Sequence, residues 1–147
     1  MKASISLFLV IIFISCTKDS SNKAQTEDDI IQYISDHNLD ALKSSSGLYY
    51  VITKQGEGTI PNSNSNVTVY YKGSFLDGSV FDQSSSQGVS FNLQQVISGW
   101  TEGIPYFNEG GEGMLLIPSN LGYGSENHNG IPGGSVLIFD IKLLKVN

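Results

Sequence analysis

Three short stretches of this chain combine aromatic residues with turn-forming glycines. The first, at 67–82, carries Tyr71 and Phe81, and it is followed by Val96-Ile97-Ser98-Gly99-Trp100 and by Gly122-Tyr123-Gly124. In this order and spacing they predict a small sheet whose inner face carries aromatic rings rather than catalytic polar groups. Few reactions can proceed in an aromatic cup, and rotation about a prolyl amide bond is one of them.

The chain lacks the polar motifs that most other chemistries need. Its histidines, His37 and His128, lie far apart, and their ordinary interpretation is a solvated helix end and a hydrogen-bonding turn residue. The sequence contains no Cys-x-x-Cys pair, no phosphate loop followed by Lys-Ser/Thr and no Gly-x-Ser-x-Gly motif. We therefore expect neither a metal nor a cofactor.

The aromatic residues also have an ordinary explanation, because rings fill the core of any small β domain. That explanation is weaker for Trp100, which follows a glycine at the start of a predicted short helix. It is also weaker for Tyr123, which lies between two glycines in a long loop. The full set of rings and nearby apolar residues comprises Tyr71, Phe81, Phe91, Val96, Ile97, Trp100, Tyr123, Ile131 and Phe139.

The charge balance excludes one large class of partner. All 8 basic residues are lysines, 14 residues are acidic, and the net charge is −6. Nucleic-acid binding needs a cationic surface, so we expect no nucleic-acid partner. The acidity is better explained by solubility.

The N-terminus has the pattern of an export signal. Lys2 precedes an apolar run at 7–14, which is too short to span a bilayer but suits a signal peptide. Phe13-Ile14-Ser15-Cys16 resembles a bacterial lipobox, in which the cysteine becomes the lipidated first residue. Ordinary cleavage near Ser15 would instead leave a free thiol. Because Cys16 is the only cysteine, and a lone thiol is a liability in an oxidising compartment, lipidation is favoured.

Residues 16–46 are expected to form a tether that contains one short helix. The segment up to Gln25 is polar and cannot bury a core. Thr26 is the expected N-cap of a helix that begins at Glu27 and ends near His37. The segment 39–46 is expected to return to a polar linker.

Residues 47–147 are expected to form one β-rich domain behind the leader (1–15) and the tether. Alternating apolar residues predict strands, and Asp77-Gly78 predicts a hairpin. Trp100, Ile104 and Phe107 share one helical stripe, which Pro105 limits in length. The pattern predicts an α+β fold, a twisted antiparallel sheet of about five strands wrapped around one short helix.

This domain resembles the FKBP-type peptidyl-prolyl cis-trans isomerases throughout 47–147, and the resemblance implies the FKBP-like form of the fold. It rests on an ordered set of motifs, namely Val-x-Val-x-Tyr-x-Gly at 67–73, Leu76-Asp77-Gly78, Phe81-Asp82, Val96-Ile97-x-Gly99-Trp100-x-Glu102-Gly103, Ile117-Pro118, Tyr123-Gly124, Gly130-Ile131-Pro132 and Leu137-x-Phe139.

The resemblance implies a role for each residue of the site. Trp100 would form the floor of a pocket, Asp82 a polar rim, and the backbone N–H of Ile97 would donate to a ligand carbonyl. The implied catalytic residues are Tyr71, Phe81, Asp82, Trp100, Tyr123 and Phe139. The implied substrate-binding residues are Phe91, Val96, Ile97, His128 and Ile131.

The chain departs from the family pattern at the rim. Tyr70 stands where many members carry histidine, and the short segment 83–88 has no arginine that could pair with Asp82. The segment after Phe91-Asn92-Leu93 is shorter than the family pattern, so that Gln94-Gln95 leads directly to Val96. These departures bear on rim selectivity and macrolide affinity rather than on the fold or the basic activity.

The favoured interpretation is a prolyl isomerase that assists the folding of exported proteins. Its partners would be proline-containing polypeptides and, through the lipid on Cys16, a bacterial envelope membrane, expected to be the outer membrane. Two alternatives remain: a binding module of the same fold with little turnover, and a structural lipoprotein with a vestigial pocket. The helix at 27–37 is too short to cover the ~800 Å² per partner of a stable interface, so we expect a monomer.

Overall fold

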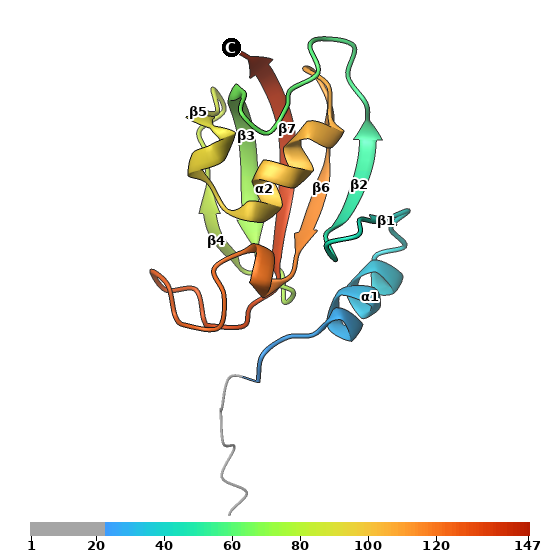
Figure 1. Ribbon diagram of the computed structural model, residues 1–147. Helices are drawn as coiled ribbons and strands as arrows, with labels where there is room; N and C mark the ends of the chain where they lie inside the picture. The colour runs from blue at the N-terminus through green and yellow to red at the C-terminus, as the bar shows by residue number, and fades with distance from the viewer. Residues whose placement is uncertain (1–22) are drawn as a thin grey trace, which may run out of the picture.

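A seven-stranded antiparallel sheet forms the centre of the protein, with one helix packed against each face (Figure 1). The structure is a computed structural model that describes residues 23–147. The predicted leader and Cys16 lie outside the described residues. Among residues 23–147, no helix is long and apolar enough to cross a membrane.

The sheet has the order β1-β2-β6-β7-β3-β4, and β5 pairs with β3 beyond the end of β4. All neighbouring strands are antiparallel. The strands are β1 (Leu42–Lys43), β2 (Tyr49–Lys54), β3 (Asn66–Ser74), β4 (Val80–Gln83), β5 (Val89–Asn92), β6 (Glu112–Ile117) and β7 (Leu137–Val146).

Alternation along the central strands separates two apolar faces. In β7 the side chains of Leu137, Phe139 and Leu143 join the larger core, whereas Ile138 joins a smaller core on the opposite face. Alternation in the sequence predicts that Leu137, Phe139, Ile141 and Leu143 face inward, and all four belong to the larger core. The period of two in a strand therefore assigns one face to α2 and the site, and the other to α1.

The larger core lies between the sheet and α2 (Ser98–Gly103), which is preceded by the 3₁₀ turn η1 (Leu93–Gln95) and followed by η2 (Ile104–Tyr106). Trp100, Ile104 and Phe107 are all buried there, as the predicted stripe requires. Pro105 lies in the first turn of η2. Because proline has no N–H to donate, the α-helix ends at Gly103 and tightens into a 3₁₀ turn.

The smaller core lies under α1 (Glu27–Asp36), whose predicted position is confirmed. Its N-terminus is closed by Asp29, whose carboxylate accepts a 2.6 Å hydrogen bond from the Thr26 backbone N–H. Ile30 is 1% exposed and packs with Tyr49, Leu116 and other apolar residues of the sheet. The helix is thus docked on the domain.

The segment 39–46, expected to be a polar linker, contains the short edge strand β1. Leu42 is paired with Tyr50, and Lys43 with Tyr49. A two-residue strand is too short to show alternation, so only the backbone pairing with β2 identifies it. With this strand the sheet has seven strands, compared with the expected number of about five.

Candidate functional site

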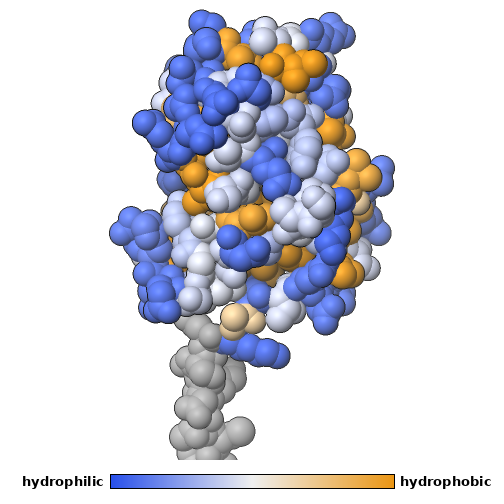
Figure 2. Space-filling model, viewed as in Figure 1, coloured by the Kyte–Doolittle hydropathy of each residue, from blue (hydrophilic) through white to orange (hydrophobic). Residues whose placement is uncertain are grey.

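A cavity of about 420 Å³ opens on the face of the sheet that carries α2. On the same face, hydrophobic side chains are exposed in patches between hydrophilic ones (Figure 2). The residues that line the cavity come from strands β3, β4, β5 and β7, from helix α2 and from two connecting segments. They are Tyr71, Phe81, Asp82, Val89, Phe91, Gln95, Val96, Ile97, Trp100, Tyr123 and Phe139.

Trp100 is one of the two buried aromatic residues of this lining, with 6% of its surface exposed against 3% for Phe139. Its ring meets Tyr71 edge-on at 4.9 Å between centroids and Phe139 edge-on at 5.0 Å, and it lies 5.2 Å from Phe91. Edge-to-face contacts of this kind stabilise aromatic clusters beyond simple burial. Gly99 permits this position, since a β-carbon there would lie 2.6 Å from the Ile117 side chain.

Phe81 and Phe139 form the wall where β4 and β7 flank β3. Their rings are perpendicular, with centroids 5.5 Å apart. Between these strands lies Gly73, which is in register with Phe139 on one side and with Asp82 on the other. A β-carbon at Gly73 would lie 2.7 Å from Phe81 Cζ and 2.8 Å from Phe139 Cε1. The absence of a side chain at Gly73 therefore allows this pair of rings to form.

The polar part of the lining is a hydrogen bond between neighbouring strands. The Tyr71 hydroxyl donates to Asp82 Oδ2 at 2.7 Å. Burial, followed by the hydrogen bond and the negative charge of Asp82, raises the pKa of Tyr71 far above its ordinary value. The hydroxyl thus stays protonated, and it holds the Asp82 carboxylate in a defined position at the edge of the aromatic cluster.

Tyr123 reaches the cavity from the loop between η3 (Ser119–Leu121) and β7. The loop is closed at its base, where the Gly134 N–H donates to the Gly124 carbonyl at 2.8 Å. The Tyr123 ring stacks on His128, with centroids 4.5 Å apart and 10° between the planes. Burial, and then the charge of Asp82, raises the pKa of Tyr123.

All but two of the predicted site residues line the cavity. The ring of His128 stacks on that of Tyr123, and His128 pairs with Ile131 in an isolated bridge. Ile131 is buried in the larger core. Both therefore support the loop of Tyr123 instead of forming the cavity surface. The reason is the tight turn between them, in which Asn129 and Gly130 have positive φ. The catalytic and binding roles of the full set stay predictions.

Sequence reasoning missed two lining residues, Val89 and Gln95. Val89 begins β5 two residues before Phe91, so strand alternation places both on one face, and this was the available signal. Gln95 ends η1 directly before Val96, and this adjacency was the one available signal. Both are brought to the cavity because β5 folds back along β3.

Two donors at the site are unused within the described chain. From residue 23 to residue 147 no acceptor pairs with the backbone N–H of Ile97, and Trp100 Nε1 is buried without a partner. No cluster of histidine, cysteine and acidic residues within 23–147 could hold a metal ion. The arrangement offers an apolar enclosure, one carboxylate and one free backbone donor.

Comparison with known proteins identifies relatives over most of this domain. Residues 57–144 match the family described as FKBP-type peptidyl-prolyl cis-trans isomerase. The chain is 50% identical over 107 residues to the FKBP-type peptidyl-prolyl cis-trans isomerase FkpA of Buchnera aphidicola subsp. Schizaphis graminum, covering 71% of this chain and 42% of the relative. It is 45% identical over 105 residues to FkpA of Escherichia coli strain K12, covering 70% and 39% respectively. The chain thus spans about two fifths of these curated relatives.

Two solved structures share the architecture. The crystal structure of FkpA from Escherichia coli superimposes with a TM-score of 0.75 at 37% identity, covering 82% of this chain and 58% of that one. A peptidyl-prolyl cis-trans isomerase from Pseudomonas syringae pv. tomato gives a TM-score of 0.72 at 31% identity, covering 85% and 98%. The α+β sheet with its short helix is therefore the fold of these proteins.

Proposed function

Because the chain belongs to the FKBP-type peptidyl-prolyl cis-trans isomerase family, we propose that it catalyses cis-trans exchange of prolyl bonds in exported polypeptides. The observation that carries this proposal is the cavity itself. Its floor and walls are aromatic, and Asp82 is the one side chain among its described lining residues that carries a charge at neutral pH. Such a lining suits a reaction that needs no acid, base or nucleophile.

The reaction needs a change of environment rather than a bond-making group. Amide resonance sets a rotation barrier of ~18–20 kcal/mol, so the bond exchanges unaided over roughly 10–100 s. The planar amide is more polar and better solvated than the twisted one. An aromatic enclosure removes that solvation and binds the twisted state in preference. Since the cis and trans forms differ by only ~0.5–1 kcal/mol, no energy source is required.

Different residues of the cavity would hold the proline ring and the two sides of the rotating bond. The pyrrolidine ring would rest on Trp100 against Phe81, where water is excluded. The unpaired N–H of Ile97 would donate to a carbonyl beside the proline, and this restrains the chain on one side of the rotating bond. Tyr71 and Asp82 would fix the other side. Preorganised groups lower the barrier because they need no rearrangement during the rotation.

The test is acceleration of exchange in a short Xaa-Pro peptide, followed in a protease-coupled assay. Phe81→Ala and Asp82→Ala should each reduce kcat/KM about tenfold or more while the circular dichroism spectrum is unchanged. Trp100→Leu should have a smaller effect, because leucine keeps the floor apolar. Binding of the peptide without acceleration would favour the alternative of a non-catalytic binding module. Full activity in both Phe81→Ala and Asp82→Ala would refute the assigned site.

We further propose that the protein acts in the bacterial cell envelope, anchored through a lipid on Cys16. The support is the sequence pattern at 1–16 and the likeness to FkpA proteins. Cys16→Ser should move the protein from the membrane fraction to the soluble fraction, and the intact mass should lose the lipid. A mature wild-type protein whose mass shows an unmodified cysteine would overturn the anchor but leave the isomerase proposal intact.

A further inference from the structure

Asp82 is a carboxylate at a largely apolar cavity, and no positive charge from residues 23–147 neutralises it. Among residues 23–147 the ion pairs are Lys43–Glu27, Lys72–Asp140 and Lys142–Glu112, and none of them includes Asp82. Its hydrogen-bond partner in this part of the chain is the Tyr71 hydroxyl, which is neutral and occupies Oδ2. The other oxygen, Oδ1, receives no donor from the described residues.

The rest of the lining adds no positive charge. None of the described lining residues is a lysine, and the chain contains no arginine at all. Asp82 lies close to two tyrosines of the same lining, since the Tyr71 hydroxyl donates to it and its negative charge contributes to raising the pKa of both Tyr71 and Tyr123. A carboxylate beside low-dielectric aromatic walls acts more strongly on a ligand than one in open water.

The position of this charge relates it to the residues that flank a bound proline. Tyr71 links the floor to the carboxylate. Its ring centroid lies 4.9 Å from that of Trp100, and its hydroxyl donates to Asp82 Oδ2 at 2.7 Å. Asp82 therefore lies about one tyrosine side chain from the floor. A proline on Trp100 would place the long side chain of a neighbouring substrate residue within reach of Oδ1.

We propose that Asp82 determines substrate specificity by selecting segments that carry lysine or arginine next to the proline. This inference rests on the proposed function, since it specifies which polypeptides the same cavity prefers. The cation of the substrate would occupy the place for which residues 23–147 supply no positively charged partner. Substrates with an acidic residue at that position would be disfavoured, because two carboxylates would face each other at the cavity.

The experiment compares matched peptides that differ only in the residue before proline, which is lysine, glutamine or glutamate. We expect kcat/KM to fall in that order, with lysine above glutamate by about three- to tenfold at low salt, the range of a partly exposed charge pair and its like-charge counterpart. The spread should shrink below about twofold near 1 M salt, where the screening length is only ~3 Å.

Two variants of the cavity and one control assign this preference to Asp82. Asp82→Asn should reduce the lysine-to-glutamate ratio below about twofold, whatever its effect on the overall rate. Gln95→Lys should also reduce the ratio, because it adds a cation to the same lining. Asp40→Asn removes one exposed negative charge outside the cavity, and it should leave the ratio unchanged. An equal ratio in Asp82→Asn and wild type, or no spread in the wild type, would overturn the proposal.

Failure of the isomerase function would give a different result from failure of the charge preference. If no peptide is accelerated, the same three peptides can be titrated while the fluorescence of Trp100, the single tryptophan of the chain, is followed. Dissociation constants ranked lysine, glutamine, glutamate, with the ranking lost in Asp82→Asn, would then support the preference in a binding module. Equal dissociation constants would reject it.

Discussion

At the scale of single residues, the cavity depends as much on an absent side chain as on the rings that line it. Gly73 separates Asp82 on β4 from Phe139 on β7, and no β-carbon could fit there without moving Phe81 or Phe139. Its φ is not in the left-handed region. The need for glycine at this position is therefore purely steric.

Substitution at Gly73 should therefore affect activity more than stability. In Gly73→Ala the new methyl group displaces Phe81 or Phe139, and we expect kcat/KM to fall about ten- to hundredfold, as small misplacements of binding groups can cause. The overpacking itself should cost about 1–3 kcal/mol in urea unfolding.

Gly103→Ala is the matched control for Gly73→Ala. Its β-carbon would meet the side chain of Leu115 at 2.7 Å, and Leu115 does not line the cavity. It should lower stability to a similar extent and leave kcat/KM near the wild-type value. Equal losses of activity in the two variants would show that general destabilisation, rather than ring displacement, is responsible.

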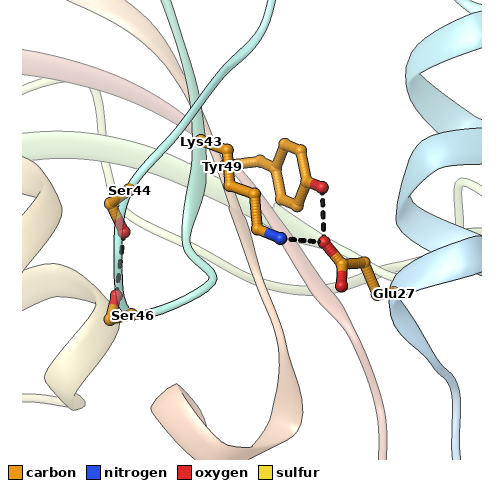
Figure 3. A network of polar contacts seen from close by, with 5 residues as sticks. All are labelled: Glu27, Lys43, Ser44, Ser46 and Tyr49. Atoms are coloured by element: carbon orange, nitrogen blue, oxygen red, sulfur yellow. Dashed lines mark hydrogen bonds and ion pairs between the residues drawn. The ribbon is translucent and has the colours of Figure 1, made fainter.

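At the scale of elements, the short helix α1 is held by apolar burial and by a polar network with the edge of the sheet. Ile30 is buried under the helix, while its neighbour Ile31 is 49% exposed. Glu27 accepts a 2.6 Å hydrogen bond from the Tyr49 hydroxyl and pairs with Lys43 (Figure 3). A ten-residue helix is marginal in isolation, so these contacts account for its docking.

Adjacent isoleucines of α1 provide a direct test of this docking. Ile30→Ala should reduce the free energy of unfolding by about 2–5 kcal/mol, the usual range for emptying a core position. Ile31→Ala should change it by less than about 0.5 kcal/mol. Both can be measured by urea denaturation. Identical midpoints would mean that α1 does not unfold together with the sheet.

The polar network should make the docking of α1 depend on pH. The hydrogen bonds from Lys43 and then Tyr49 lower the pKa of Glu27 below its ordinary value of 4.5. A lowered folded-state pKa means that this stabilisation is complete above the unfolded-state pKa and is lost as pH falls through the folded-state pKa. The stability advantage of wild type over Glu27→Gln should thus shrink as the pH falls below the ordinary carboxyl pKa of 4.5. A constant difference in urea midpoints would contradict this.

At the scale of the whole molecule, the two faces of the sheet have different uses. One carries α2 and the aromatic cavity, and the other is covered in part by α1 (Figure 1). Ile30, the apolar residue that α1 buries most completely, is already packed against the sheet of its own chain. The helix therefore retains little apolar surface for a second copy, compared with the ~800 Å² per partner of a stable interface.

The protein from Lys18 onward should accordingly sediment as a monomer at micromolar concentration. The expected mass is that of a single chain over about a tenfold range of concentration. A dimer would make the exposed pair Ile31 and Leu42, 49% and 56% exposed, the first surface to examine. Ile31→Lys would then be expected to restore the monomer, and its failure to do so would locate the interface elsewhere.

The sequence alone determined the features that depend on local patterns. Alternation placed Phe139 and Leu143 on one face of β7, Asp77-Gly78 marked the β3–β4 hairpin, and Thr26 marked the start of α1. The ordered motifs also predicted which aromatic residues belong together. Local patterns suffice here because strand and helix periodicity act over a few residues.

Only the tertiary structure decided how distant segments meet. Val89 and Gln95 enter the lining because β5 pairs with β3 and η1 follows β5 directly. His128 and Ile131 are instead joined by a tight turn and do not line the cavity. The lack of an ionic partner for Asp82 among residues 23–147 likewise depends on the arrangement, since the sequence does not show which carboxylates the lysines of this part will meet. Contacts between residues far apart in sequence depend on strand order and loop closure, which no short window of sequence contains.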